Sequence, residues 1–166
     1  MDHSIVYFSR TGNTARLAEA LREALGPEGC RWFGPPAPAA AEAPVLCVGF
    51  WTDKGICSED CQAFLRDLRG KTVFLFGTAG FGGDPAYYEK ILANVKACLD
   101  GSNTIAGTFM CQGQMMPMVR ARYEQQLAQD PANAAARGML ETFDRAVGHP
   151  DAADLAALCA AAHAAL

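Results

Sequence analysis

The polar stretch Ser9-Arg10-Thr11-Gly12-Asn13-Thr14 carries the residue types that hold a phosphate group. It follows the apolar run Ile5–Phe8, which is typical of a strand buried on both faces, and precedes an amphipathic helix. Hydroxyl groups and the Asn13 amide donate hydrogen bonds to anionic oxygens, and Gly12 permits a tight backbone turn. Free backbone N–H groups and the helix dipole also favour an anion there. The sequence therefore predicts a phosphate site between the first strand and the first helix.

This stretch matches every specified position of the pattern (Thr or Ser)-x-Thr-Gly-Asn-Thr, and in this the chain resembles the flavodoxins. The resemblance implies that the loop holds the phosphate of flavin mononucleotide (FMN). The alternative is an ordinary polar turn between a strand and a helix, which the complete match disfavours. The residues expected to bind the phosphate are Ser9, Arg10, Thr11, Gly12, Asn13 and Thr14.

Two later loops are expected to contact the flavin ring. One starts at Trp51, and the other is the glycine-rich stretch Gly77–Asp84. A planar ring needs aromatic faces and close backbone approach, and both loops offer them. In flavodoxins the first loop often carries a tryptophan, and the second a glycine–aspartate pair with an aromatic residue. The expected contacts are Trp51, Thr52, Asp53 and Gly55 in the first loop, and Thr78, Ala79, Gly80, Phe81, Gly83, Asp84 and Tyr87 in or just after the second.

The stretch Trp51-Thr52-Asp53 departs from the Trp-Gly-Asp of many flavodoxins. In those proteins the peptide after the tryptophan can turn its carbonyl toward N5 of the reduced flavin. Threonine resists the positive φ that favours such a change, so Gly55 is the residue that could replace the missing glycine.

The order of apolar runs predicts an α/β fold of the flavodoxin-like, doubly wound type, with five parallel strands in the order 2-1-3-4-5 and helices on both faces. In this order the loops after strands one and three flank the point where such sheets bind ligands. A proline-rich surface connection is expected at 34–44. The strands are predicted at Ile5–Phe8, Cys30–Phe33, Val45–Phe50, Thr72–Phe76 and Thr104–Met110, and helices follow the phosphate loop, Ser58 and Pro85.

An extended helical segment, at about 112–147, follows the last strand and is longer than a minimal flavodoxin needs. Its methionine-rich start, Cys111–Met118, and the later His149-Pro150-Asp151 resemble a bacterial group of flavodoxin-like proteins. Some of that group accompany reductases of other substrates, including tetrapyrroles. Methionines, Arg120 and Arg122 could form a partner surface, with core packing and a solvated helix face as the alternatives. The predicted helices lie at about 118–129 and 134–147, and a final one starts near Asp151.

Composition narrows the classes of function. The 166 residues, 51% of them hydrophobic, suit a single flavodoxin-like domain over 1–166, and a net charge of −4 disfavours nucleic-acid binding. No apolar run approaches the ~18 residues that cross a membrane, and no room is left for a signal peptide. Seven cysteines, an odd number, favour free thiols in the cytoplasm, and Cys57 with Cys61 lacks further ligands for a metal.

These observations favour an electron-transport protein that binds FMN and passes electrons from a reductase to an acceptor enzyme. The flavin supplies the oxidoreductase chemistry, so no catalytic residue is assigned, and nearby acidic residues are expected to disfavour the anionic reduced flavin. One alternative is an FMN-dependent reductase with its own substrate under the 112–118 loop, with tetrapyrrole reduction as one association. Another is a flavin-free interaction module with the same fold.

Overall fold

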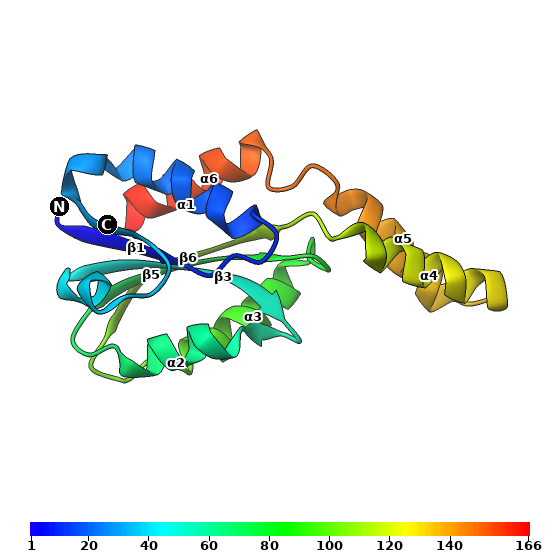
Figure 1. The fold of residues 1–166 in the computed structure, drawn as a ribbon, viewed down its shortest axis with the longest axis horizontal. Coiled ribbons are helices and arrows are strands. Elements are labelled where there is room, and N and C mark those ends of the chain that lie inside the picture. The colour runs from blue at the N-terminus through cyan, green and yellow to red at the C-terminus, as the bar shows by residue number, and fades with distance from the viewer.

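The computed structural model describes residues 1–166 as a parallel sheet between two layers of helices, from which a helical hairpin extends (Figure 1). The predicted strand order is confirmed, because β5 and β6 are the fourth and fifth strands of the expected sheet. A short additional strand, β4 (Ile56–Cys57), pairs antiparallel with the end of β3. In order across the sheet the parallel strands are β2 (Cys30–Gly34), β1 (His3–Tyr7), β3 (Val45–Asp53), β5 (Thr72–Ala79) and β6 (Thr104–Gln112).

Helices α1 (Asn13–Leu25) and α6 (Ala152–Ala165) cover one face of the sheet, and α2 (Glu59–Asp67) and α3 (Pro85–Lys96) cover the other (Figure 1). The apolar residues whose spacing predicts α1 are the ones that pack against the sheet, since Leu17, Ala18 and Leu21 are fully buried. An Asp151 carboxylate caps α6 by accepting hydrogen bonds from the first-turn backbone. None of the helices combines the length and apolarity that a membrane-spanning helix has.

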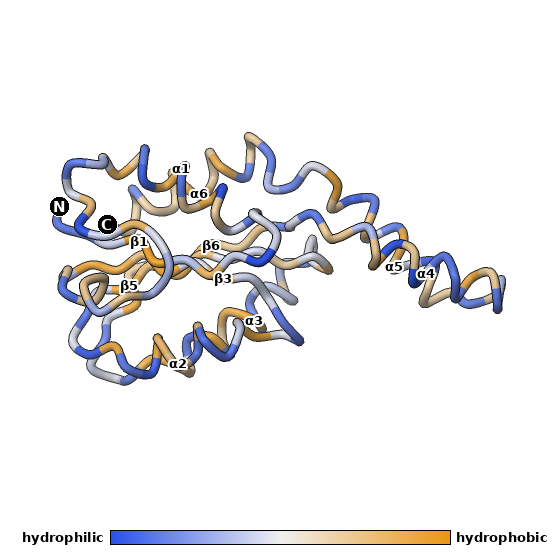
Figure 2. Tube along the Cα trace, in the orientation of Figure 1, coloured by the Kyte–Doolittle hydropathy of each residue, from blue (hydrophilic) through white to orange (hydrophobic).

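The core consists of two apolar clusters, one on each face of the sheet. Val48, Phe50 and Leu75 face α2 and α3, whereas Phe74 and Phe76 face α1 and α6. Strands buried on both faces produce the nearly continuous apolar runs that predict them. Figure 2 shows the same concentration of hydrophobic residues along the central strands.

The two helices predicted after the last strand are present as α4 (Pro117–Gln129) and α5 (Ala134–Ala146), and they form a helical hairpin. The hairpin projects beyond the end of the sheet instead of covering a face of it (Figure 1). Helix α4 buries no residue, and the Arg120 guanidinium joins the two helices through an ion pair with Asp144. The two helices therefore pack chiefly on each other.

The structure corrects two expectations about loops. Residues 51–53 belong to strand β3 and not to a turn, because Trp51 pairs with Thr78 of β5 and because Thr52 pairs with Cys57 of β4. Only Lys54 and Gly55 remain as the turn, and both have positive φ, at 51° and 85°. The connection at 34–44 is also more regular than expected, since it contains a short 3₁₀ helix whose Ala40 is fully buried.

Close packing at the centre of β3 generates a test of this fold. A Cβ added to Gly49 would lie 2.4 Å from the Phe76 ring and 3.0 Å from a Thr14 methyl group. We expect Gly49→Ala to lower the free energy of unfolding by about 1–3 kcal/mol, because the buried ring has no free space to move into. Urea denaturation measures the change.

Gly101→Ala is the matched control, because an added Cβ there meets no atom within 4 Å. We expect its free energy of unfolding to stay within about 0.5 kcal/mol of the unsubstituted protein. Equal stability of the two variants would contradict this account of the packing.

Candidate functional site

The candidate site lies where the carboxyl ends of β1, β3 and β5 meet. These strands are parallel and adjacent, so the segments that follow them lie at one edge of the sheet. The segment after β1 is the predicted phosphate loop, and the ends of β3 and β5 carry the predicted ring contacts. The three segments that the sequence predicts to form the site therefore lie at one edge of the sheet.

The backbone of the phosphate loop forms an open helix N-terminus. Gly12 caps α1 with φ of 92°, a conformation that favours glycine, and no side chain caps the helix through Gly12. The N–H groups of residues 11–14 have no acceptor within the chain, while the Ala15 N–H donates to Ser9 Oγ at 3.2 Å. Four unpaired N–H groups at the positive end of α1 make this a suitable position for an anion.

The side chains of this loop divide into free and structural groups. Thr11 is exposed and forms no hydrogen bond in the structure, whereas Thr14 is buried with its Oγ1 3.3 Å from Thr78 Oγ1. Asn13 Nδ2 donates to the Gln114 carbonyl at 2.9 Å. In the structure the hydroxyl of Thr11 is therefore free, whereas those of Ser9 and Thr14 also have partners within the chain, and phosphate binding by these side chains stays a prediction.

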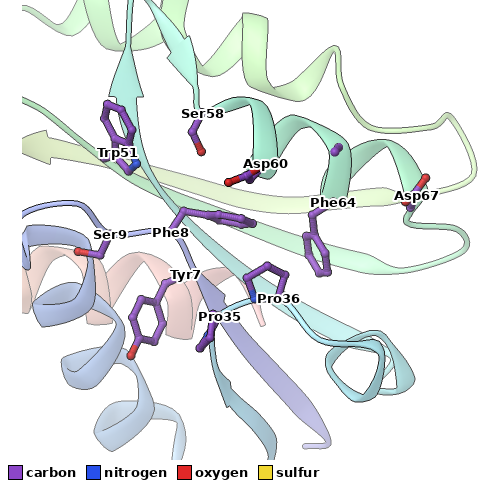
Figure 3. Close-up of a pocket in the computed structure, with 11 residues that line it drawn as sticks. Tyr7, Phe8, Ser9, Pro35, Pro36, Trp51, Ser58, Asp60, Phe64 and Asp67 are labelled. Carbon is purple, nitrogen blue, oxygen red and sulfur yellow. The ribbon is translucent and has the colours of Figure 1, made fainter.

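Trp51 lies beside the phosphate loop and carries a cation on its ring. The Arg10 guanidinium carbon is 5.4 Å from the centroid of the indole, a contact that the sequence does not reveal. Trp51 and Ser9 also line a cavity of about 730 Å³ between β1 and α2, along which Phe8 reaches toward Phe64 (Figure 3). The two phenylalanine rings are 6.2 Å apart.

A second cavity, of about 620 Å³, collects most of the residues expected to contact a ring. It lies between the β3–β4 turn, the end of β5 and helix α3. Its lining also contains residues that the sequence did not predict: Lys54 from the predicted loop itself, and others from two helices whose approach no local pattern encodes. The expected members are Thr52, Asp53, Gly55, Ala79, Gly80, Phe81 and Tyr87, and the additional ones are Lys54, Lys90, Ile91, Asn94 and Arg122.

This second cavity has a positive lining. Lys54, Lys90 and Arg122 supply three cations, and Asp53 is the single acidic residue. The expectation of acidic residues near the flavin ring stays a prediction, and Asp53 is the residue of this cavity that meets it. The net charge of −4 describes the whole chain and does not determine the charge of one cavity.

Hydrogen bonds fix the two walls of this cavity. Thr52 Oγ1 donates to the Thr78 carbonyl at 2.9 Å, which ties β3 to β5 through a side chain as well as through the backbone. Asn94 Nδ2 donates to the Gly55 carbonyl at 2.9 Å, which ties the turn to α3. The turn that carries Lys54 is thus held by a strand and a helix.

The segment from Gly80 to Asp84 is held by Tyr88. The Gly83 N–H donates to Tyr88 Oη at 2.9 Å, and Gly83 has a φ of 102°. Asp84 accepts a hydrogen bond from the Ala86 N–H and so caps α3. Gly83 and Asp84 therefore shape the segment, and neither lines the cavity.

The base of the hairpin contacts both the phosphate loop and the end of β5. Besides its contact with Asn13, Gln114 receives a hydrogen bond on Oε1 from the Gly148 N–H at 3.0 Å. Gln112 Nε2 donates to the Gly80 carbonyl at 3.1 Å and the Thr142 carbonyl at 3.3 Å. A third cavity, of about 330 Å³, lies here and is lined by Thr11, Asn13, Gln114, Met115, Met116 and Pro117.

The hydroxyl of Tyr88 can be tested directly. We expect Tyr88→Phe to speed hydrogen exchange at the Gly83 amide, because that N–H loses its acceptor, and to cost about 0.5–1.5 kcal/mol of stability. Hydrogen-exchange NMR measures the first effect. Tyr87→Phe removes the same atom from a neighbour whose hydroxyl forms no hydrogen bond in the structure; if it changes Gly83 exchange as much, the assignment fails.

The same hydroxyl predicts a dependence of stability on pH. Burial raises the pKa of Tyr88 from 10.0 to about 12. The folded protein therefore keeps the phenol neutral where the unfolded chain ionises it, so stability is retained below pH 10 and falls as pH rises toward 12. We expect a smaller decline for Tyr88→Phe in denaturation curves across this range. Identical declines in both proteins would assign the pH dependence to other groups.

Comparison with known proteins identifies the family. The family model described as a flavodoxin domain matches residues 4–163. The flavodoxin-like domain-containing protein BilS of Clostridium symbiosum (strain WAL-14163) is 41% identical over 175 residues, covering 95% of this chain and 92% of that protein. The BilS protein of Clostridioides difficile (strain CD3) is 27% identical, covering 91% and 88% of the two chains.

Solved structures agree with the fold. The flavodoxin, WrbA-like protein from Agrobacterium tumefaciens has a TM-score of 0.52 at 18% identity and covers 96% of this chain and 98% of its own. A flavoprotein from Lactobacillus acidophilus NCFM, solved in complex with FMN, has a TM-score of 0.50 at 13% identity and covers 66% of this chain and 92% of its own. With its phosphate-loop sequence, its strand order and a family match over nearly its whole length, the chain belongs to the flavodoxin family.

Proposed function

We propose that this protein binds FMN noncovalently and carries electrons from a reductase to an acceptor enzyme. The observation that carries the proposal is the open N-terminus of α1, beside the exposed Thr11 hydroxyl and at the same sheet edge as the 620 Å³ cavity. An anion site next to a cavity of this size suits a ligand with a phosphate at one end and a flat ring at the other.

The residues of the site fit such a ligand. The N–H groups of residues 11–14 and the Thr11 hydroxyl would hold the phosphate, and the cavity between Thr52 and Phe81 would receive the ring. Gly80 and Gly55 allow backbone to approach the ring there. Arg10 now occupies a face of Trp51, so a ring stacked on that face would displace this guanidinium.

When bound, FMN supplies the electron-transfer chemistry, and the chain binds it, orients it and shields part of it from water. The similar structure from Lactobacillus acidophilus NCFM contains FMN, which supports the choice of this flavin. Seven free cysteines, four of them buried, support a reducing compartment such as the cytoplasm.

A second candidate is an FMN-dependent reductase with its own small-molecule substrate. The 330 Å³ cavity under residues 114–117 favours it, because this space adjoins the phosphate loop and is separate from the two larger cavities. Steady oxidation of NAD(P)H in the presence of a small acceptor, with no second protein, would support the reductase over the carrier.

Thr11→Val tests the phosphate assignment. We expect the variant to bind FMN at least about tenfold more weakly, because a hydrogen bond to a charged group is lost, and to bind riboflavin as the unsubstituted protein does. Quenching of flavin fluorescence measures both affinities. The comparison separates the phosphate contact from the ring contacts.

Thr104→Val is the control, since Thr104 is also exposed and begins β6, at the edge of the sheet opposite to the candidate site. It should bind both flavins normally. If neither flavin binds the folded, unsubstituted protein, the proposal is wrong, and a flavin-free interaction module becomes the better account.

A further inference from the structure

The three cations of the 620 Å³ cavity come from separate parts of the fold. Lys54 lies at the β3–β4 turn, Lys90 on α3 and Arg122 on α4 of the hairpin. None of the three forms an ion pair within the chain. These three cations give the cavity a positive potential, although the whole chain has a net charge of −4.

Lys54 adds an independent observation. It is the only residue other than glycine with positive φ, at 51°, and it forms a two-residue hairpin turn with Gly55. Asparagine or glycine would adopt this conformation at lower cost, because a longer side chain at positive φ is strained. Lys54 therefore has an unfavourable backbone conformation, and such conformations cluster at ligand-binding and active sites.

The rest of the lining restricts the ligand further. Phe81 is 41% exposed, and Tyr87 also faces the cavity. Aromatic side chains favour a flat apolar body, and cations on a concave wall favour carboxylates on that body. A concave site of about 620 Å³ fits a small molecule better than the flat surface of a protein partner.

The geometry points to a binding site for an aromatic carboxylate, held by Lys54, Lys90 and Arg122. The inference rests on the proposed function for what lies beside this anion: the flavin ring would take the part of the cavity between Thr52 and Phe81, and the carboxylate would lie against it on the side of Lys90 and Arg122. If the protein is the FMN-dependent reductase, its substrates would then be aromatic carboxylates. The hairpin takes part in binding, because Arg122 is the cation that it contributes.

Calorimetric titration with benzene-1,3-dicarboxylate tests this site in the FMN-loaded protein. We expect Lys90→Gln/Arg122→Gln to bind the dicarboxylate at least about tenfold more weakly, since two charged donors are lost. The matched control, Lys96→Gln/Arg137→Gln, removes the same charge from α3 and from the hairpin outside the cavity, and should bind normally. The neutral benzene-1,3-dicarboxamide should bind much more weakly than the dicarboxylate.

Lys54→Asn gives a second, sharper measurement. Asparagine tolerates positive φ, so we expect this variant to melt at a higher temperature and yet to bind the dicarboxylate more weakly. Opposite changes in stability and affinity would support a functional lysine, and they do not arise from a variant that merely unfolds. Unchanged affinity in Lys54→Asn would argue against its part in the site.

Three results would overturn the inference: equal losses of affinity in the two double variants, equal affinity for the dicarboxamide and the dicarboxylate, or binding of poly-glutamate without binding of the dicarboxylate.

A parallel FMN titration, done without the dicarboxylate, keeps the two proposals apart. If FMN fails to bind, the proposed function fails, and the same variants in the FMN-free protein decide the anion site. If the Lys90/Arg122 variant loses FMN instead, the cations belong to the flavin site and the inference is wrong.

Discussion

The absence of a side chain at Gly49 is the constraint on which the site depends. It leaves space between β3 and α1 that the Phe76 ring and the Thr14 methyl group occupy, so the first turn of α1 lies directly on the sheet. The Thr14 hydroxyl then contacts Thr78, which joins the phosphate loop to β5. A larger residue at position 49 would move the helix N-terminus away from the sheet edge where the cavities lie.

Apolar patterning predicts most of this fold, because parallel strands buried on both faces and amphipathic helices leave distinct periods in the sequence. It does not predict where a strand ends when pairing continues past the apolar run. Trp51 and Thr52 illustrate this: their pairs are Thr78 and Cys57, and only the second strand of each pair reveals that β3 continues. The sequences of α4 and α5 likewise do not predict that these helices project away from the sheet.

The site shows the same division between local and distant information. A local motif identifies the phosphate loop, but which side chains remain free depends on residues far along the chain, such as Gln114 for Asn13. The charge of the 620 Å³ cavity depends on Lys90 and Arg122, which no spacing connects to Thr52. Overall charge does not predict the charge of a small cavity, because only a few residues line it.

The hairpin divides into a part that touches the candidate site and a part that does not. Its base, from Gln112 to Gln114, is bonded to the phosphate loop, to Gly80 and to the segment that leads into α6. Its outer end is bonded within the hairpin, as the hydrogen bond from the Arg137 guanidinium to the Pro131 carbonyl illustrates. Evolution or an engineer could therefore lengthen, shorten or exchange those outer turns as a module, whereas any change at the base would alter the geometry of the cavities themselves.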